Sequence, residues 1–183
     1  MTGIGAMKAA IGGRTEMTDK TSFTPEEWRQ LLRSVSLAGV AVTAASPSGP
    51  IGVVKEMFAA GKIVARAKTN GPANELIKAV AADLATPEGR AQASEGIQTE
   101  FAGASPDQIK ARAIEALRRT AAIVDAKADP QEAREFKLWL RSISQQVAEA
   151  AKEGAFLGIG GVRVSEAEQA ALREIAEVLG LPA

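Results

Sequence analysis

The 183-residue chain contains no cysteine, no histidine and no tyrosine, and only 4% of its residues are aromatic. Without cysteine it can form neither disulfides nor a reactive thiolate, which fits a reducing compartment and leads us to expect a cytoplasmic protein. Without imidazole and thiolate groups it cannot build the usual zinc sites, a Ser-His-Asp triad or a histidine-containing di-iron centre. The sequence therefore favours a protein with no catalytic residue, no cofactor and no metal.

An excess of charge of either sign is also lacking. The 22 Lys and Arg residues balance 22 Asp and Glu residues, so the formal net charge is zero. Nothing in the overall charge would attract the chain to a phosphate backbone, and we expect no nucleic-acid partner. Acidic residues interrupt the basic stretch 110–119 and its surroundings, which favours a solvated helix face of mixed charge there.

Long hydrophobic runs are missing as well. The most apolar stretch, residues 34–45 (SVSLAGVAVTAA), is followed by Pro47 and Pro50. It is shorter than the roughly 20 residues that a membrane-spanning helix requires. Its Ala and Gly residues would allow close packing, so we predict a buried core helix. Lys8 and Arg14 interrupt the N-terminal residues, and we expect a disordered extension over 1–22 before a single helical domain over 23–183.

The sequence is rich in alanine, which occurs at 37 positions. It also contains regular signals for helix starts. Ala has the highest helix propensity. Four helix starts place a capping residue before a proline and an acid, at Thr24-Pro25, Thr86-Pro87, Ser105-Pro106 and Asp129-Pro130, and a fifth is Ser165 without proline. These signals predict helices over 25–45, 50–67, 72–85, 87–102, 106–127, 130–153 and 166–180. The expected fold is all-α, a compact bundle of about six to seven helices.

A glycine-rich stretch, GAFLGIGGVRVS, covers residues 154–165. It begins like a dinucleotide-binding fingerprint with Gly158 and Gly160, but Arg163 occupies the place of the third glycine. It also lacks the early carboxylates of a calcium loop. The sequence predicts instead a short β-hairpin near 157–164 that turns at Gly160-Gly161. Its apolar side chains would share one face, with Gly158 and Arg163 on the other.

Residues 161–181, from Gly161 to Leu181, resemble the closing motif of the TerB-like family of tellurite-resistance and stress proteins. The shared features are a glycine turn, a β-branched residue and Ser, and a Glu-rich helix that ends in Leu-Gly-Leu. The resemblance implies a helical, stress-associated protein. It does not imply metal binding, because Gly160 stands where the family has an acidic residue. With its FTPEEW segment, the chain as a whole also resembles uncharacterised bacterial helical proteins.

Our main functional prediction is a non-enzymatic interaction or stress-associated protein that binds a protein partner or a second copy of itself. The candidate partner-binding residues are Trp28, Trp139, Gly158 and Arg163. For the two tryptophans the alternative interpretation is that each covers the edge of its own core.

Two further classes of function stay open at this stage. An enzyme or small-ligand binder could use carboxylates on one helix face, such as Glu132 with Glu135 or Glu149 with Glu153. Association with a membrane surface could use the apolar and basic residues between 55 and 68.

Overall fold

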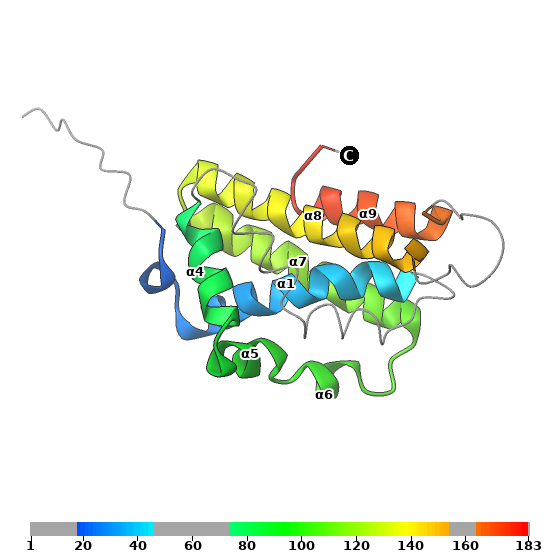
Figure 1. Cartoon of the computed structure of the whole chain (residues 1–183), viewed down its shortest axis with the longest axis horizontal. Coiled ribbons are helices and arrows are strands. Elements are labelled where there is room, and N and C mark those ends of the chain that lie inside the picture. The colour runs from blue at the N-terminus through cyan, green and yellow to red at the C-terminus, as the bar shows by residue number, and fades with distance from the viewer. Residues whose placement is uncertain (1–17, 46–73, 154–163, 183) are drawn as a thin grey trace, which may run out of the picture.

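The computed structural model describes residues 18–45, 74–153 and 164–182, and within these ranges every regular element is a helix (Figure 1). This confirms the all-α class. A 3₁₀ turn, η1 (Lys20–Ser22), precedes the first helix. The α-helices are α1 (Pro25–Ala45), α4 (Glu75–Leu84), α5 (Pro87–Ser94), α6 (Ile97–Phe101), α7 (Pro106–Lys127), α8 (Pro130–Glu153) and α9 (Glu166–Val178).

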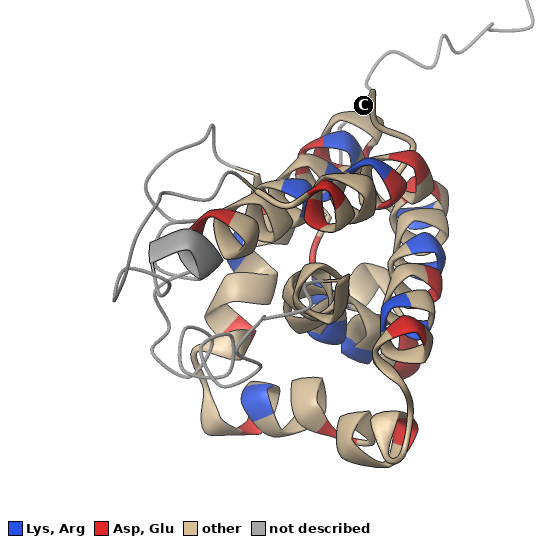
Figure 2. Ribbon diagram, turned by 90° about the vertical axis from the view of Figure 1, so that its right-hand side faces the viewer, with Lys and Arg blue, Asp and Glu red and all other residues tan. Residues whose placement is uncertain are grey.

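Helix α1 is the centre of the bundle. It packs against α4, α5, α7, α8 and α9, and a view along the bundle shows it surrounded by other helices (Figure 2). The predicted burial of 34–45 is confirmed, because Val35, Leu37 and Val42 are each 1% exposed. None of the helices in the described ranges has the length and apolarity needed to cross a membrane.

Small side chains and satisfied hydroxyls make the central position of α1 possible. Ser34 and Thr43 are buried and donate to carbonyls of their own helix at 2.7 and 3.0 Å. Ser144 of α8 donates its hydroxyl to the Ala38 carbonyl of α1 at 2.9 Å. Because a buried hydroxyl without a partner is costly, these bonds let polar residues sit in the core without destabilising it.

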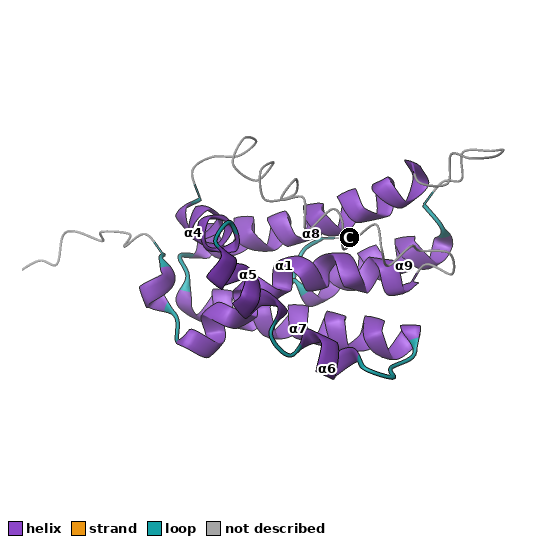
Figure 3. Ribbon diagram, turned by 60° about the horizontal axis from the view of Figure 1, so that its bottom comes forward, coloured by secondary structure: helices purple, strands orange, loops and turns teal. Residues whose placement is uncertain are grey.

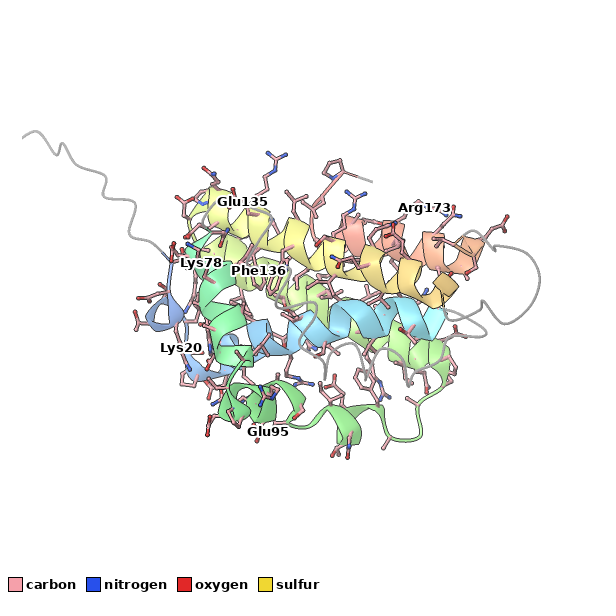
Figure 4. The ribbon with its side chains drawn as sticks, viewed as in Figure 1. Lys20, Lys78, Glu95, Glu135, Phe136 and Arg173 are labelled. Atoms are coloured by element: carbon pink, nitrogen blue, oxygen red, sulfur yellow. The ribbon has the colours of Figure 1, made fainter. Side chains whose placement is uncertain are left out.

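Helix α8 supplies the apolar stripe that the sequence predicts. Phe136 points into the bundle between the helices (Figure 4). The described stripe residues are at most 3% exposed: Ala133, Phe136, Leu140, Ile143 and Val147. The side chain of Ala150, the last predicted position, lies outside the described part. The stripe therefore anchors the described part of α8 in the bundle, chiefly against α1.

The helix starts follow the local signals. Thr24 and Glu27 form the predicted capping box, with bonds of 2.7 and 3.2 Å, and the Phe23 ring lies 5.8 Å from the Trp28 ring as a staple. The bounds of α1, α7 and α8 agree with the predicted ranges. Helix α9 begins with a second predicted box, and Gly180 (φ 65°) ends it in a Schellman motif.

Two helices differ from the prediction. The helix expected over 87–102 is two short helices, because Gly96 adopts a left-handed φ of 75° and separates α5 from α6. The helix expected over 72–85 begins at Glu75, since the Asn74 side chain accepts from the Ile77 amide and caps it. The helix expected over 50–67 lies outside the described residues.

The predicted hairpin near 157–164 falls outside the described residues except for Val164. No strand occurs in the described part of the chain (Figure 3). The hairpin thus stays a prediction.

The folded part begins before the boundary predicted at residue 23. Thr18 is 3% exposed, its amide donates to Glu132 Oε2, and its hydroxyl accepts from the Asp129 amide, both at 3.0 Å. These bonds attach Thr18 to the turn between α7 and α8 and to the first turn of α8. Residues 1–17, the rest of the predicted extension, lie outside the described part.

Enlarging Ala38 to leucine should destabilise the protein, because Ala38 is fully buried where α1 crosses α8. We expect a loss of about 1–3 kcal/mol in the free energy of unfolding. Urea unfolding followed by tryptophan fluorescence measures it. The matched control is Ala122→Leu on the exposed face of α7, which should change stability by less than about 0.5 kcal/mol. Equal effects of the two variants would contradict close packing around α1.

Candidate interaction surface

The two tryptophans predicted as partner anchors lie in the core of the described structure. Trp28 is 2% exposed, and its Nε1 donates to Asp83 Oδ2 at 2.7 Å. Trp139 is 9% exposed and packs edge-on against Phe136, with ring centroids 5.5 Å apart. Both positions fit the alternative interpretation, in which each tryptophan covers its own core. Gly158 and Arg163, the other two candidates, lie outside the described residues.

Asp83 joins three elements at the end of the bundle where α1 begins. It accepts from Trp28 of α1 and, at 2.8 Å, from Lys20 of η1. The Lys20 ammonium also lies 5.7 Å from the centroid of the Trp28 ring. Burial raises the pKa of Asp83, but the hydrogen bonds from Lys20 and Trp28 outweigh it, and the pKa lies below its ordinary value of 3.8. Asp83 therefore acts as a structural anion that orients α4.

Three of the four carboxylates considered for catalysis accept structural hydrogen bonds, and the side chain of Glu153, the fourth, lies outside the described part. Glu132 accepts from the Thr18 amide, and Glu135 Oε2 accepts from Asn74 Nδ2 at 2.9 Å. Glu149 accepts from Gln145 at 2.8 Å. No group of three or more potential metal ligands comes together within the described ranges. Glu132 and Glu135 thus fasten the N-terminal segment and the start of α4 to α8, whereas the Glu149 bond stays within α8.

A different set of charged side chains lies between the bundle and the α5–α6 segment (residues 87–101). Arg29 and Arg33 are one helical turn apart on α1, and Arg112 projects from α7; we call these three side chains the arginine face. Arg29 Nε lies 3.4 Å from Glu95 Oε2, and Arg33 forms an ion pair with Glu100. Glu95 lies beside α5, below α1 in the view of Figure 4. The pairs connect elements that are far apart in sequence.

Helix α6 is attached to the bundle mainly through this charged contact. None of its residues is buried, and Phe101 is only partly buried against the core. Arg112 Nη1 donates to the backbone carbonyl of Glu100, near the end of α6 where carbonyls lack helical partners. Helix α5 is held more closely by packing. Its Ala93 is buried, and its Gly89 lies so near the Asp83 carbonyl that an added methyl group would overlap that carbonyl. Anchoring thus weakens from α5 to α6.

The arginine face retains unused hydrogen-bonding capacity. The Nε atoms of Arg29 and Arg33 are buried, yet neither makes a hydrogen bond among the described residues, although Glu95 Oε2 lies 3.4 Å from Arg29 Nε. Burying an unpaired donor is unfavourable, and such groups are rare in protein interiors. A carboxylate or carbonyl oxygen that took the place of the present contact could satisfy these two donors.

Sequence reasoning did not single out Arg29 and Arg33. Their signal is the four-residue spacing, which puts both on one face of a helix that is otherwise largely apolar. Arg112 was part of the stretch expected to be a solvated mixed-charge face; it is exposed, yet contacts α6. The glutamates that meet these arginines are 66 and 67 positions away in the chain, a distance at which local patterns carry no information.

Comparisons with known proteins gave no match, whether with family models, curated proteins or solved structures.

The contribution of Asp83 to stability should depend on pH. The pKa of Asp83 is lowered in the folded state, so its stabilisation is present above the ordinary value of 3.8 and is lost as the pH falls through the lower folded value. Asp83→Asn should be less stable than the unchanged protein at pH 7, and the difference should shrink below about pH 4. Urea unfolding across pH measures it, with exposed Asp107→Asn as the control for loss of a carboxylate. A difference that stays constant down to pH 2 would contradict the charged role.

Removing one arginine should release α6 without unfolding the bundle. Arg33→Gln removes the ion pair with Glu100, worth about 1 kcal/mol, so amide exchange at Glu100 and Ala104 should become roughly fivefold faster. Hydrogen exchange with mass spectrometry measures it. Arg118→Gln is the matched control, because its pair with Glu115 lies within α7 and is exposed. Unchanged exchange in Arg33→Gln would mean that the core, and not charge, holds α6.

Proposed function

We propose that the protein is a non-enzymatic helical interaction protein that binds a protein partner through the arginine face. The observation that carries this proposal is that the Arg33–Glu100 ion pair attaches α6, which has no buried residue of its own, beside the buried and unpaired Nε atoms of Arg29 and Arg33. That contact has the character of a protein–protein interface, where Arg is enriched. The bundle thus has a surface suited to holding a helical segment.

The framework around this surface is rigid where the contact requires it. Arg29 and Arg33 belong to α1, whose other faces are packed, and Arg112 belongs to α7. Gln30 of α1 connects these two helices, since its Nε2 donates to the Ala116 carbonyl at 2.8 Å. Charged groups held on rigid helices lose less conformational entropy when a partner binds.

The remaining expectations from the sequence belong to this proposal. The proposal includes a cytoplasmic location, the stress-associated role implied by the TerB-like resemblance, and the contacts predicted for Gly158 and Arg163. Binding through the arginine face does not depend on any of these three. Self-association through the same face is the form that the interaction takes if the partner is a second copy.

Reversing the charge of the face should abolish partner binding. In a pull-down from a lysate of the source cells, we expect the wild-type chain to recover a partner protein that the Arg29→Glu/Arg33→Glu variant does not recover. Sedimentation velocity of the purified chain detects self-association. Binding of the recovered protein is then measured again with purified components. Reversal replaces attraction to a carboxylate by repulsion.

The control for this experiment is Arg118→Glu/Arg119→Glu, which reverses two exposed charges on α7. Circular dichroism establishes that both double variants are folded. A partner that binds all three proteins equally, or no partner and no self-association with the wild type, would refute the proposal.

A further inference from the structure

We propose that residues 95–101, which follow α5 and include α6, are an intramolecular competitor that occupies the site where an acidic peptide segment of the partner binds. This inference rests on the proposed interaction function. It adds the chemistry of the partner and a means by which the fold controls access to the arginine face.

Charge complementarity indicates the kind of partner. The groups now on the face are two carboxylates, Glu95 and Glu100, and the backbone carbonyl of Glu100. A guanidinium can bind a carboxylate through two parallel N–H bonds. Arg33 makes its ion pair through Nη2, while its Nε has no acceptor among the described residues. The segment thus leaves part of the donor capacity free, which a better-fitting carboxylate can use.

The apolar part of the contact narrows the partner further. Phe101 follows Glu100 directly and packs against the core, although it remains partly exposed. A competing segment that places an aromatic side chain beside a carboxylate would reproduce this pair of contacts. The expected partner segment is therefore acidic with an adjacent aromatic residue.

Displacing α6 costs little packing. A helix of five residues is unstable by itself in water, and α6 buries none of its residues. It lies between Gly96 (φ 75°) and Gly103 (φ 66°), and at neither position would a Cβ meet any atom within 4 Å. The two glycines provide backbone freedom at both ends of α6. The helix can therefore leave the arginine face while α5 stays packed on α1.

The experiment uses the full chain and a fluorescent peptide with the sequence of residues 94–104, which contains both glutamates and Phe101. Glu95→Gln/Glu100→Gln in the protein weakens the internal competitor but keeps the arginine face. Fluorescence anisotropy should show that the peptide binds this variant at least roughly fivefold more tightly than it binds the wild type, because the weakened internal segment competes less with the peptide. Its affinity should fall as salt is added.

Two controls separate competition from unspecific binding. A peptide with Gln at both glutamate positions should not bind, and Arg29→Gln/Arg33→Gln added to the variant should abolish binding of the acidic peptide. The inference is overturned if the acidic peptide binds wild type and variant equally, if both peptides bind alike, or if neither protein binds it. If one of these results is found, but Arg29→Glu/Arg33→Glu still fails to bind a partner that the wild type binds, the proposed function stands and only the competition is refuted.

Discussion

The burial of α1 on most of its sides is the constraint on which the rest of the fold depends. A helix can take a central position only if neighbours approach closely and if its polar groups are satisfied. The residues from Ser34 to Ala45 meet both conditions, because they are small or apolar and carry no charge, and the buried hydroxyls of Ser34 and Thr43 bond within the helix. Helices α7, α8 and α9 are then arranged by the need to cover this one helix.

The first half of α1 has the opposite character, and this asymmetry gives the molecule its surface chemistry. Arg29 and Arg33 cannot be buried without partners, since desolvated charges are costly. The α5–α6 segment supplies carboxylates to them, while Asp83 satisfies the indole of Trp28. Charged contacts of this kind specify where α4, α5 and α6 lie more than they add to stability.

The same asymmetry divides the molecule into a well-packed body and a loosely held helix. Opening of α6 exposes little apolar surface, whereas opening of α8 would expose a full stripe of core residues. Regions of low local stability are those in which binding and regulation are commonly found. The distribution of burial thus marks α6 as the helix of the described structure that can open with the least loss of packing.

The sequence by itself determined the helical class, the bounds of α1, α7 and α8, and the burial of 34–45, because capping residues, prolines and apolar periodicity act within one or two turns. It did not determine the break at Gly96, since a glycine is compatible with helix until neighbouring elements select its φ. Nor did it place Trp28 against Asp83, or Arg33 against Glu100. Those pairs are 55 and 67 residues apart, and only the packing of helices around α1 brings them together.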